Sequence, residues 1–248
     1  EEAAHREEHR IRQLAPRAVG RASAEIAELV DRLGLLDLLR AGERLRNDFH
    51  GSVVAVGEGP AFELSRLRHP LLSLDHGPDT VVPADLALGG EQRCLVISGP
   101  NTGGKTVLLK AAGLVHWMAY CGLPVPAEGS LGWFEQIWAV IGDQQSLAAD
   151  LSTFSAQLVR IKSLLEGLNE HRLVLVDELG SGTNPGEGGA LGLAVLDRLR
   201  TSGCVSLVST HLERLKHYAV AQPEVVNAAV GFDLDRLAPT YELRWEQA

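Results

Sequence analysis

The sequence predicts an α/β protein whose mostly parallel central sheet is covered by helices and preceded by a small helical segment. Two observations support this fold class. After residue 90, apolar strand-like runs alternate with helix-like runs along the chain. In addition, strand-like runs such as Leu173–Val176 are apolar throughout, which is typical of a sheet that is buried on both faces.

The bulk composition is that of a globular protein with a substantial core. The chain has 248 residues, of which 45% are hydrophobic, and its mean hydropathy is +0.02. This length accommodates one sizeable α/β domain and a small appendage. The net charge of −9, without a dense Lys/Arg block, argues against binding nucleic acid over the whole surface. A nucleic-acid partner would need a local patch or a part of the protein outside this sequence.

Cysteine usage and the chain start bear on the compartment. Three cysteines without C-x-x-C spacing disfavour a disulfide framework and structural zinc, and fit a reducing cytoplasm. No apolar run reaches transmembrane length, and the acidic, arginine-rich start does not resemble a signal peptide, so we expect no membrane partner. The missing initiator methionine suggests a piece of a longer protein.

The first part of the chain is predicted to be helical. From Ser23, which is the expected N-cap, apolar residues recur at helical spacing. The charged stretch Glu1–Arg12 predicts a solvated helix or a frayed end. The expected domains are therefore a helical segment over residues 1–50 and an α/β domain over residues 51–248.

Short strands are predicted after Gly51, followed by the α/β alternation. The early strands are Val53–Val56, Phe62–Leu67 and Thr80–Val82, with Gly-Pro pairs between them. The later strands are Cys94–Ser98, Trp138–Ile141, Leu173–Val176 and Val205–Ser209, and the helices are Lys105–Tyr120, Ser155–Leu168 and Glu187–Arg200. Further strand pairing is expected in the tail, over Val225–Asp233 and Thr240–Trp245.

A glycine-rich octapeptide joins the strand at Cys94–Ser98 to the following helix. It matches G-x-x-x-x-G-K-[ST] with Gly99, Pro100, Asn101, Thr102, Gly103, Gly104, Lys105 and Thr106. In such a loop, backbone N–H groups surround phosphate oxygens at a helix N-terminus. Lys105 would neutralise β/γ-phosphate charge, and Thr106 would ligate Mg²⁺. The alternative, an ordinary turn with a chance lysine, does not account for the strand–loop–helix context.

An acid pair follows the apolar strand Leu173–Val176. Asp177 would hold Mg²⁺ directly or through water, and Glu178 would orient and polarise the attacking water. The alternative is an acid pair that merely caps a strand. The glycines that follow suit either a loop approaching another nucleotide or subunit, or a plain turn into a helix near Pro185.

Three further polar residues are candidates on weaker evidence. His211 follows a buried strand and could contact a γ-phosphate, and its Ser-Thr-His context alone distinguishes it from the other eight histidines. Ser152 and Thr153 precede a helix-like run, where hydroxyl residues are usually ordinary caps.

Together these segments resemble the ATPase domain of bacterial MutS-like proteins, and within them the MutS-two branch. The resemblance covers about Arg68 to the end of the chain. It rests on GPNTGGKTVLLK, IGDQQS, LSTFS, LVLVDELGSGTNPGEG, the Ser209–His211 triplet and Arg68-His69-Pro70. Asn101-Thr102 and Val107 match the loop of this branch, GPNTGGKTV, where mismatch-repair relatives typically read GPNMGGKS.

The resemblance implies an ABC-type P-loop NTPase sandwich that acts as a homodimer with composite ATP sites. In the family pattern, Asn101 matches the loop asparagine, and Gln144 or Gln145 falls in the segment that acts as the Q-loop. Ser152 and Thr153 match the signature segment offered to the other subunit's γ-phosphate, and His211 matches the switch histidine. The segment Gly180–Thr183 corresponds to the D-loop. Val107 completes the expected ATP-binding set.

The implied activity is Mg²⁺-dependent ATP hydrolysis that switches a dimer interface during DNA processing, including branched-DNA binding, suppression of homologous recombination and DNA repair. The alternative is a ribosome-rescue ATPase that splits collided ribosomes. A transporter ATPase would carry an LSGGQ-like signature where LSTFS stands. A non-catalytic scaffold is disfavoured by the intact residues Lys105, Asp177, Glu178 and His211.

This sequence departs from the family pattern in three respects. Compared with the family pattern, we expect this sequence to lack the Smr nuclease domain, for which it has no room, and the helical segment after Tyr241-Glu242-Leu243 that helps to clasp the dimer. No aromatic residue near Val81-Val82 can be assigned to stack on adenine.

Overall fold

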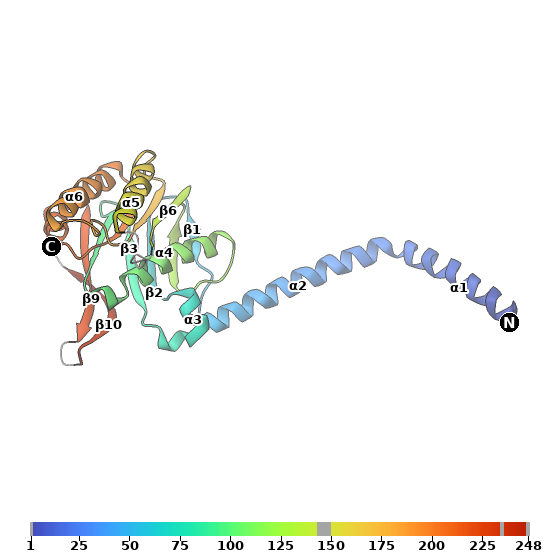
Figure 1. Cartoon of the computed structure of the whole chain (residues 1–248). Helices are drawn as coiled ribbons and strands as arrows, with labels where there is room; N and C mark the ends of the chain where they lie inside the picture. Colours follow the sequence, from blue (N-terminus) through green and yellow to red (C-terminus); the bar gives the residue numbers. More distant parts are fainter. Residues whose placement is uncertain (1, 143–149, 234–235, 247–248) are drawn as a thin grey trace. The chain divides into compact units, whose positions relative to one another are not determined.

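The computed structural model describes residues 2–142, 150–233 and 236–246, and the chain divides into two compact units, Glu1–Leu45 and Arg46–Ala248. The first unit contains helix α1 (Glu2–Arg21) and most of helix α2 (Ser23–Phe49), as Figure 1 shows. The prediction that Ser23 is an N-cap is wrong, because α2 begins at Ser23 itself. Its hydroxyl donates to the Gly20 carbonyl oxygen at 2.9 Å instead of accepting from a helix N–H.

The second unit is built on a six-stranded sheet with the order β10-β9-β4-β8-β7-β6. Its strands are β4 (Cys94–Ser98), β6 (Gln136–Val140), β7 (Arg172–Val176), β8 (Val205–Ser209), β9 (Val225–Asp233) and β10 (Ala238–Glu246). All neighbouring pairs are parallel except β9–β10, which is antiparallel. The predicted α/β class with a mostly parallel sheet is therefore confirmed.

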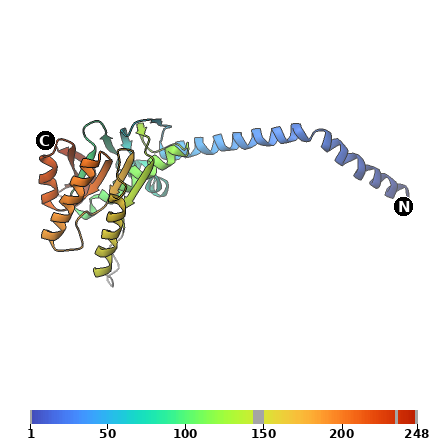
Figure 2. The ribbon, with the colours of Figure 1, turned by 90° about the horizontal axis from the view of Figure 1, so that it is seen from above.

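Helices cover both faces of this sheet, because its central strands are apolar on both sides. Leu95 and Ile97 of β4 face one core, which contains helix α4 (Lys105–Tyr120). Cys94 and Val96 face the other core. That second core packs against α5 (Asp150–Leu165), α6 (Pro185–Ser202) and α7 (Glu213–Val220). Figure 2 shows α5 and α6 together on one side of the strands.

A second, four-stranded sheet closes the α4 side of the core. Its order is β1-β5-β2-β3, formed by β1 (Ala55–Gly57), β5 (Glu128–Gly132), β2 (Phe62–Leu67) and β3 (Ala84–Leu88). Buried residues of this sheet, such as Phe62 and Leu64, belong to the same core as α4. The small sheet and α4 therefore share one hydrophobic core.

The strand predicted over Thr80–Val82 is wrong. Pro78–Thr80 forms a 3₁₀ turn, and the strand begins later, at Ala84. The N–H of Val81 donates to the Pro78 carbonyl at 3.3 Å, and the Val81 carbonyl accepts from Arg68 Nε at 3.2 Å. Both backbone groups of Val81 are thus used locally, so this segment does not join a ladder.

The helix predicted over Ser155–Leu168 is displaced in the structure. It is observed as α5, Asp150–Leu165, so residues 152 and 153 lie in its first turn and not ahead of it. Three of the four residues in the first turn, Asp150, Ser152 and Thr153, are polar, so a pattern of apolar residues gives little sign of where the helix begins. Helix α3 (Pro70–His76), helix α7 and strands β3 and β5 were not predicted from the sequence.

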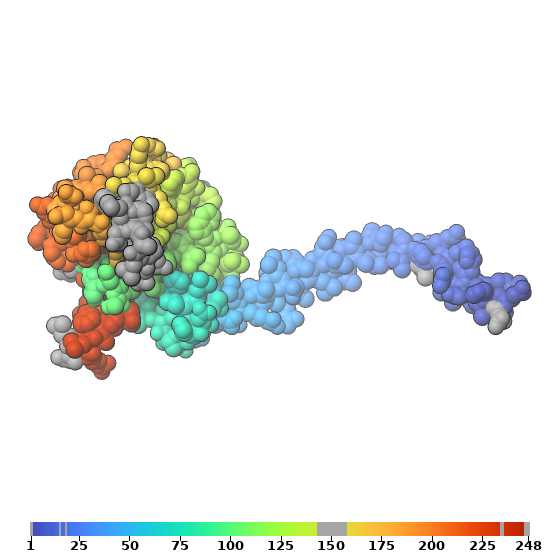
Figure 3. All heavy atoms as spheres, viewed as in Figure 1, coloured from blue at the N-terminus to red at the C-terminus, as the bar shows by residue number. Residues whose placement is uncertain are grey.

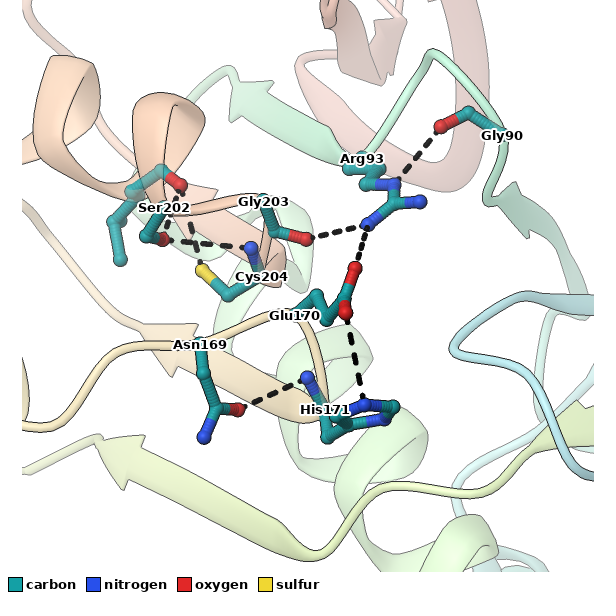
Figure 4. Close-up of polar contacts among 9 residues, drawn as sticks. Gly90, Arg93, Asn169, Glu170, His171, Ser202, Gly203 and Cys204 are labelled. Atoms are coloured by element: carbon teal, nitrogen blue, oxygen red, sulfur yellow. Dashed lines mark hydrogen bonds and ion pairs between the residues drawn. The ribbon is translucent and has the colours of Figure 1, made fainter.

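The amino edge of the large sheet is held by polar contacts that Figure 4 shows. The Arg93 guanidinium donates to the carbonyl oxygens of Gly90 and Gly203, each at 2.9 Å, and lies 3.9 Å from a Glu170 carboxylate oxygen. These contacts join the segments that enter β4, β7 and β8. The opposite, carboxyl edge is where ligands bind in open parallel sheets.

Candidate nucleotide site

The glycine-rich loop lies at the carboxyl end of β4, where the motif predicts it. Residues Asn101–Gly103 form a short 3₁₀ turn, and Gly104 then adopts a left-handed conformation with φ of 90° as α4 begins at Lys105. A Cβ at Gly104 would also lie 3.2 Å from the Tyr241 ring. The left-handed backbone therefore favours glycine at this position, and the Tyr241 ring leaves little room for a side chain. Figure 3 shows the loop region in green beside β10 in red.

The Lys105 ammonium lies within the curve of this loop. Its Nζ donates to the carbonyl oxygens of Gly99 at 2.6 Å and Pro100 at 2.9 Å, and to Asn101 Oδ1 at 3.3 Å. The side chain is buried, and burial lowers the pKa of Lys105, while the nearby Glu178 and Asp177 carboxylates oppose that shift. A cation is thus held at the loop beside the carboxylate pair.

Thr106 and Asp177 meet although they are 71 positions apart in the sequence. Thr106 stands in the first turn of α4, and its Oγ1 donates to Asp177 Oδ2 at 2.6 Å. Asp177 follows β7, and its backbone N–H donates to the Val140 carbonyl of β6 at 2.9 Å. The two residues predicted to share a metal role therefore lie together at the carboxyl edge of the sheet.

Glu178 has an unusual backbone conformation, with φ of 50°, which is uncommon for a residue with a Cβ. Its N–H donates to Ser209 Oγ at 2.8 Å. Its carbonyl oxygen accepts from both the N–H and the hydroxyl of Ser181, at 3.0 Å and 2.7 Å. Both peptide groups of Glu178 are thus fixed by side chains or turns around it.

His211 follows β8 at the same edge of the sheet and is exposed. The two residues before it are buried: Ser209 donates to Asp177 Oδ1 at 2.5 Å, and Thr210 Oγ1 donates to the Leu179 carbonyl at 3.1 Å. The Ser-Thr-His triplet therefore joins β8 to the segment after β7. Sequence reasoning had singled out only the histidine of this triplet.

The remaining predicted ligands are only partly described. Gln144 and Gln145 lie outside the described residues. Ser152 and Thr153 lie in α5, but their side chains are outside the described part of the chain. The segment Gly180–Thr183 forms the loop between β7 and α6, and two of its glycines have positive φ, 84° at Gly180 and 80° at Gly182.

A cavity of about 800 Å³ opens beside the loop. Asn101, Thr102, Thr106 and Val107 form its loop side, and its other walls include Val81, Val82, His69, Leu243 and Tyr241. The walls are largely apolar, and the volume is in the range of pockets that take small organic ligands.

Tyr241 is the aromatic residue of this cavity, and sequence reasoning did not find it. The register of β10 against β9 shifts between Pro239 and Leu243, and Tyr241 within this irregularity has φ of 59°. Bulges of this kind redirect side chains. The bulge turns the Tyr241 ring toward Gly104 of the loop.

His69, from the Arg68-His69-Pro70 motif, lies on the same wall and caps α3. Its Nδ1 accepts from the Leu72 N–H at 3.4 Å. Burial and the charge of Lys110 lower the pKa of His69. A neutral ring is therefore favoured, with one nitrogen occupied by the helix N-terminus.

The parallel sheet, the loop between β4 and α4, and the lysine within that loop define a P-loop NTPase class of fold. The chain matches the family described as MutS domain V over residues 95–244, and so belongs to that family.

Curated relatives agree with this assignment. The chain is similar to "Endonuclease MutS2" of Shouchella clausii, with 43% identity over 96% of this chain and 30% of the relative. Proteins with the same name from Gemmatimonas aurantiaca and Lactobacillus helveticus are 47% and 41% identical, over 86% and 88% of this chain and 26% and 28% of the relatives. The chain thus spans less than a third of the length of the curated relatives it matches.

Proposed function

We propose that this chain is an ATPase unit that binds Mg²⁺-ATP and hydrolyses it to drive a MutS-like DNA-processing protein. The observation that carries the proposal is the 2.6 Å contact between Thr106 and Asp177 at the mouth of the glycine-rich loop. Hydroxyl and carboxylate oxygens are the ligands that Mg²⁺ prefers, so these residues fit that ion. When bound, Mg²⁺ would neutralise phosphate charge.

Each residue has a distinct role in this proposal. The loop N–H groups and Lys105 bind the phosphates, and the apolar cavity with Tyr241 receives the base. Glu178 orients a water molecule and accepts its proton, and His211 donates to the γ-phosphate. Gln144 or Gln145 is the candidate Q-loop residue and is proposed to contribute to ATP binding.

The proposal includes a homodimer, because Ser152 and Thr153 are expected to act on the partner's ATP. Residues 1–50 would be the end of a helical arm moved by the 51–248 ATPase domain when the interface closes and reopens. The mass of the chain, measured with and without a non-hydrolysable ATP analogue, tests this. An ATP-dependent doubling of the mass would support the composite site, and a monomer under both conditions would mean that the composite site cannot form in this chain.

Hydrolysis is tested by phosphate release with Glu178→Gln, which removes the acceptor carboxylate but keeps the size of the side chain. We expect ATP binding to remain and turnover to fall by at least about 100-fold. Glu166→Gln, an exposed position at the end of α5, is the matched control and should turn over like the parent. Turnover by Glu178→Gln at the parent rate would exclude the role proposed for Glu178.

The partner is proposed to be DNA, since the relatives carry the name of an endonuclease. Gel shifts of the full-length protein on four-way junctions should show binding, and co-sedimentation with collided ribosomes is the competing outcome. We propose a cytoplasmic location. Among the helices of the described residues, none has the length and apolar content needed to cross a bilayer.

A further inference from the structure

Ser209 is the one side chain that hydrogen-bonds both members of the acid pair in the described part of the chain. It ends β8, beside β7, and is fully buried. Its hydroxyl donates to Asp177 Oδ1 at 2.5 Å and accepts from the Glu178 N–H at 2.8 Å. A serine hydroxyl has one proton and two lone pairs, so one atom can serve both neighbours at once.

The contact to Asp177 fixes the orientation of its carboxylate. One oxygen, Oδ1, accepts from Ser209, and the other, Oδ2, accepts from Thr106 at 2.6 Å. The carboxylate plane is therefore held from two sides, by β8 and by α4. Without the Ser209 hydroxyl, only the Thr106 contact would remain, and the carboxylate could rotate about it.

The contact to Glu178 supports a strained backbone. A residue with a Cβ at φ of 50° costs roughly 1–2 kcal/mol relative to the right-handed region, and such conformations persist only where surrounding contacts enforce them. Ser209 binds the N–H side of Glu178, and Ser181 binds its carbonyl side. In addition, the Leu179 N–H donates to the Ser209 carbonyl at 2.9 Å. The direction in which the Glu178 side chain leaves the backbone depends on these bonds.

We propose that Ser209 is a positioning residue for ATP hydrolysis, which orients Asp177 toward the metal ligand Thr106 and holds Glu178 in its left-handed conformation. This inference rests on the proposed ATPase function. Ser209 is buried, so it acts through the two acids and does not itself touch the nucleotide.

The chain offers a matched control on the same strand. Ser206 is also fully buried in β8, and its hydroxyl donates to Cys94 Sγ at 2.8 Å, in the sheet interior and away from the loop. Ser206→Ala and Ser209→Ala each remove one buried hydroxyl from β8. A purely structural role predicts similar effects of the two changes on activity and stability.

The test compares Ser209→Ala, Ser206→Ala and Ser209→Thr in phosphate release and in Mg²⁺ titrations of fluorescent-ATP binding, with urea unfolding to confirm folding. For Ser209→Ala we expect turnover to fall about 10- to 100-fold, with KM for ATP within about 3-fold of the parent. The Mg²⁺ concentration for half-maximal binding should rise about 10-fold. Ser209→Thr, which keeps the hydroxyl, should retain most turnover, and Ser206→Ala should match the parent.

Two outcomes would overturn the inference about Ser209. One is that folded Ser209→Ala matches Ser206→Ala in both turnover and Mg²⁺ dependence. The other is that Ser209→Thr and Ser209→Ala lose activity equally while both remain folded. If the parent chain neither binds nucleotide with Mg²⁺ nor hydrolyses ATP, the proposed function itself fails, which is a distinct result.

Discussion

We predict that His116 makes the stability of the unit Arg46–Ala248 depend on pH, although it lies away from the site residues. This histidine of α4 is fully buried, and its Nδ1 lies 2.7 Å from the Ala112 carbonyl oxygen. Its ring packs edge-on against Phe62, with centroids 5.0 Å apart, and contacts the rings of Phe134 and Tyr120. Burial lowers the pKa of His116 to about 4, against an opposing effect of the Ala112 hydrogen bond.

The sign of the effect follows from linkage. The native state keeps His116 neutral down to about pH 4, whereas the unfolded chain takes up a proton below its ordinary pKa of 6.5. Between these values the unfolded state binds more protons than the native state. The free energy of unfolding therefore falls by about 1.4 kcal/mol for each unit by which the pH is lowered. Going from about pH 7.5 to about pH 5, the His116 contribution is a loss of about 2 kcal/mol.

The assay is urea unfolding of the parent and of His116→Phe at both pH values. The phenylalanine keeps an aromatic ring among Phe62, Phe134 and Tyr120 but cannot titrate. Because burial raises the pKa of Tyr120, its hydroxyl does not titrate in this range. We expect the parent to lose about 2 kcal/mol more than the variant between the two pH values. If the unfolding free energies of the parent and of His116→Phe change between the two pH values by amounts that agree within about 0.5 kcal/mol, this result would refute the reasoning.

Three further predictions concern local features of the unit Arg46–Ala248. Gly180→Ala places a Cβ 2.6 Å from the Gly188 carbonyl at φ of 84°, whereas Gly122→Ala meets no atom within 4 Å at φ of 73°. Urea unfolding should therefore show Gly122→Ala costing about 1 kcal/mol and Gly180→Ala at least about 2 kcal/mol more. Tyr241→Ala should weaken binding of a fluorescent ATP analogue about 10-fold, while Tyr241→Phe should bind it within about 3-fold of the parent. Equal affinities of Tyr241→Ala and the parent would contradict the proposed contact between the Tyr241 ring and the base. Asn184→Ala should lower the free energy of unfolding by about 1 kcal/mol in thermal or urea unfolding, because Asn184 Oδ1 caps α6 by accepting from the Gly186 N–H at 2.8 Å. Asn184→Asp, which keeps an acceptor oxygen, should retain most of the parent's stability.

Much of the central fold could be predicted because its signals are local. The strand Cys94–Ser98, the loop that follows and the helix Lys105–Tyr120 were each predicted with the observed bounds. An apolar run bounded by glycine, and a motif of fixed spacing, are properties of neighbouring residues. They need no knowledge of the rest of the chain.

Local signals failed where side chains from elsewhere decide the backbone. Thr80–Val82 has the composition of a strand. However, the Val81 carbonyl accepts from the Arg68 guanidinium, and the Val81 N–H donates to the Pro78 carbonyl within a turn. Similarly, the polar first turn of α5 hides the true start of that helix at Asp150. Hydrogen bonding outweighed apolar patterning at Thr80–Val82, and the start of α5 has too few apolar residues to give a periodic signal.

The sequence by itself determined the class of fold, the position of the glycine-rich loop and the position of the acid pair, because these depend on motifs within short segments. The tertiary structure alone decided which distant groups act on them. Thr106 meets Asp177 across 71 positions, Ser209 holds both acids from a neighbouring strand, and the bulge in β10 directs Tyr241 to the loop. Such contacts depend on strand order and register, which are set by packing of the whole core and are not encoded in any one segment.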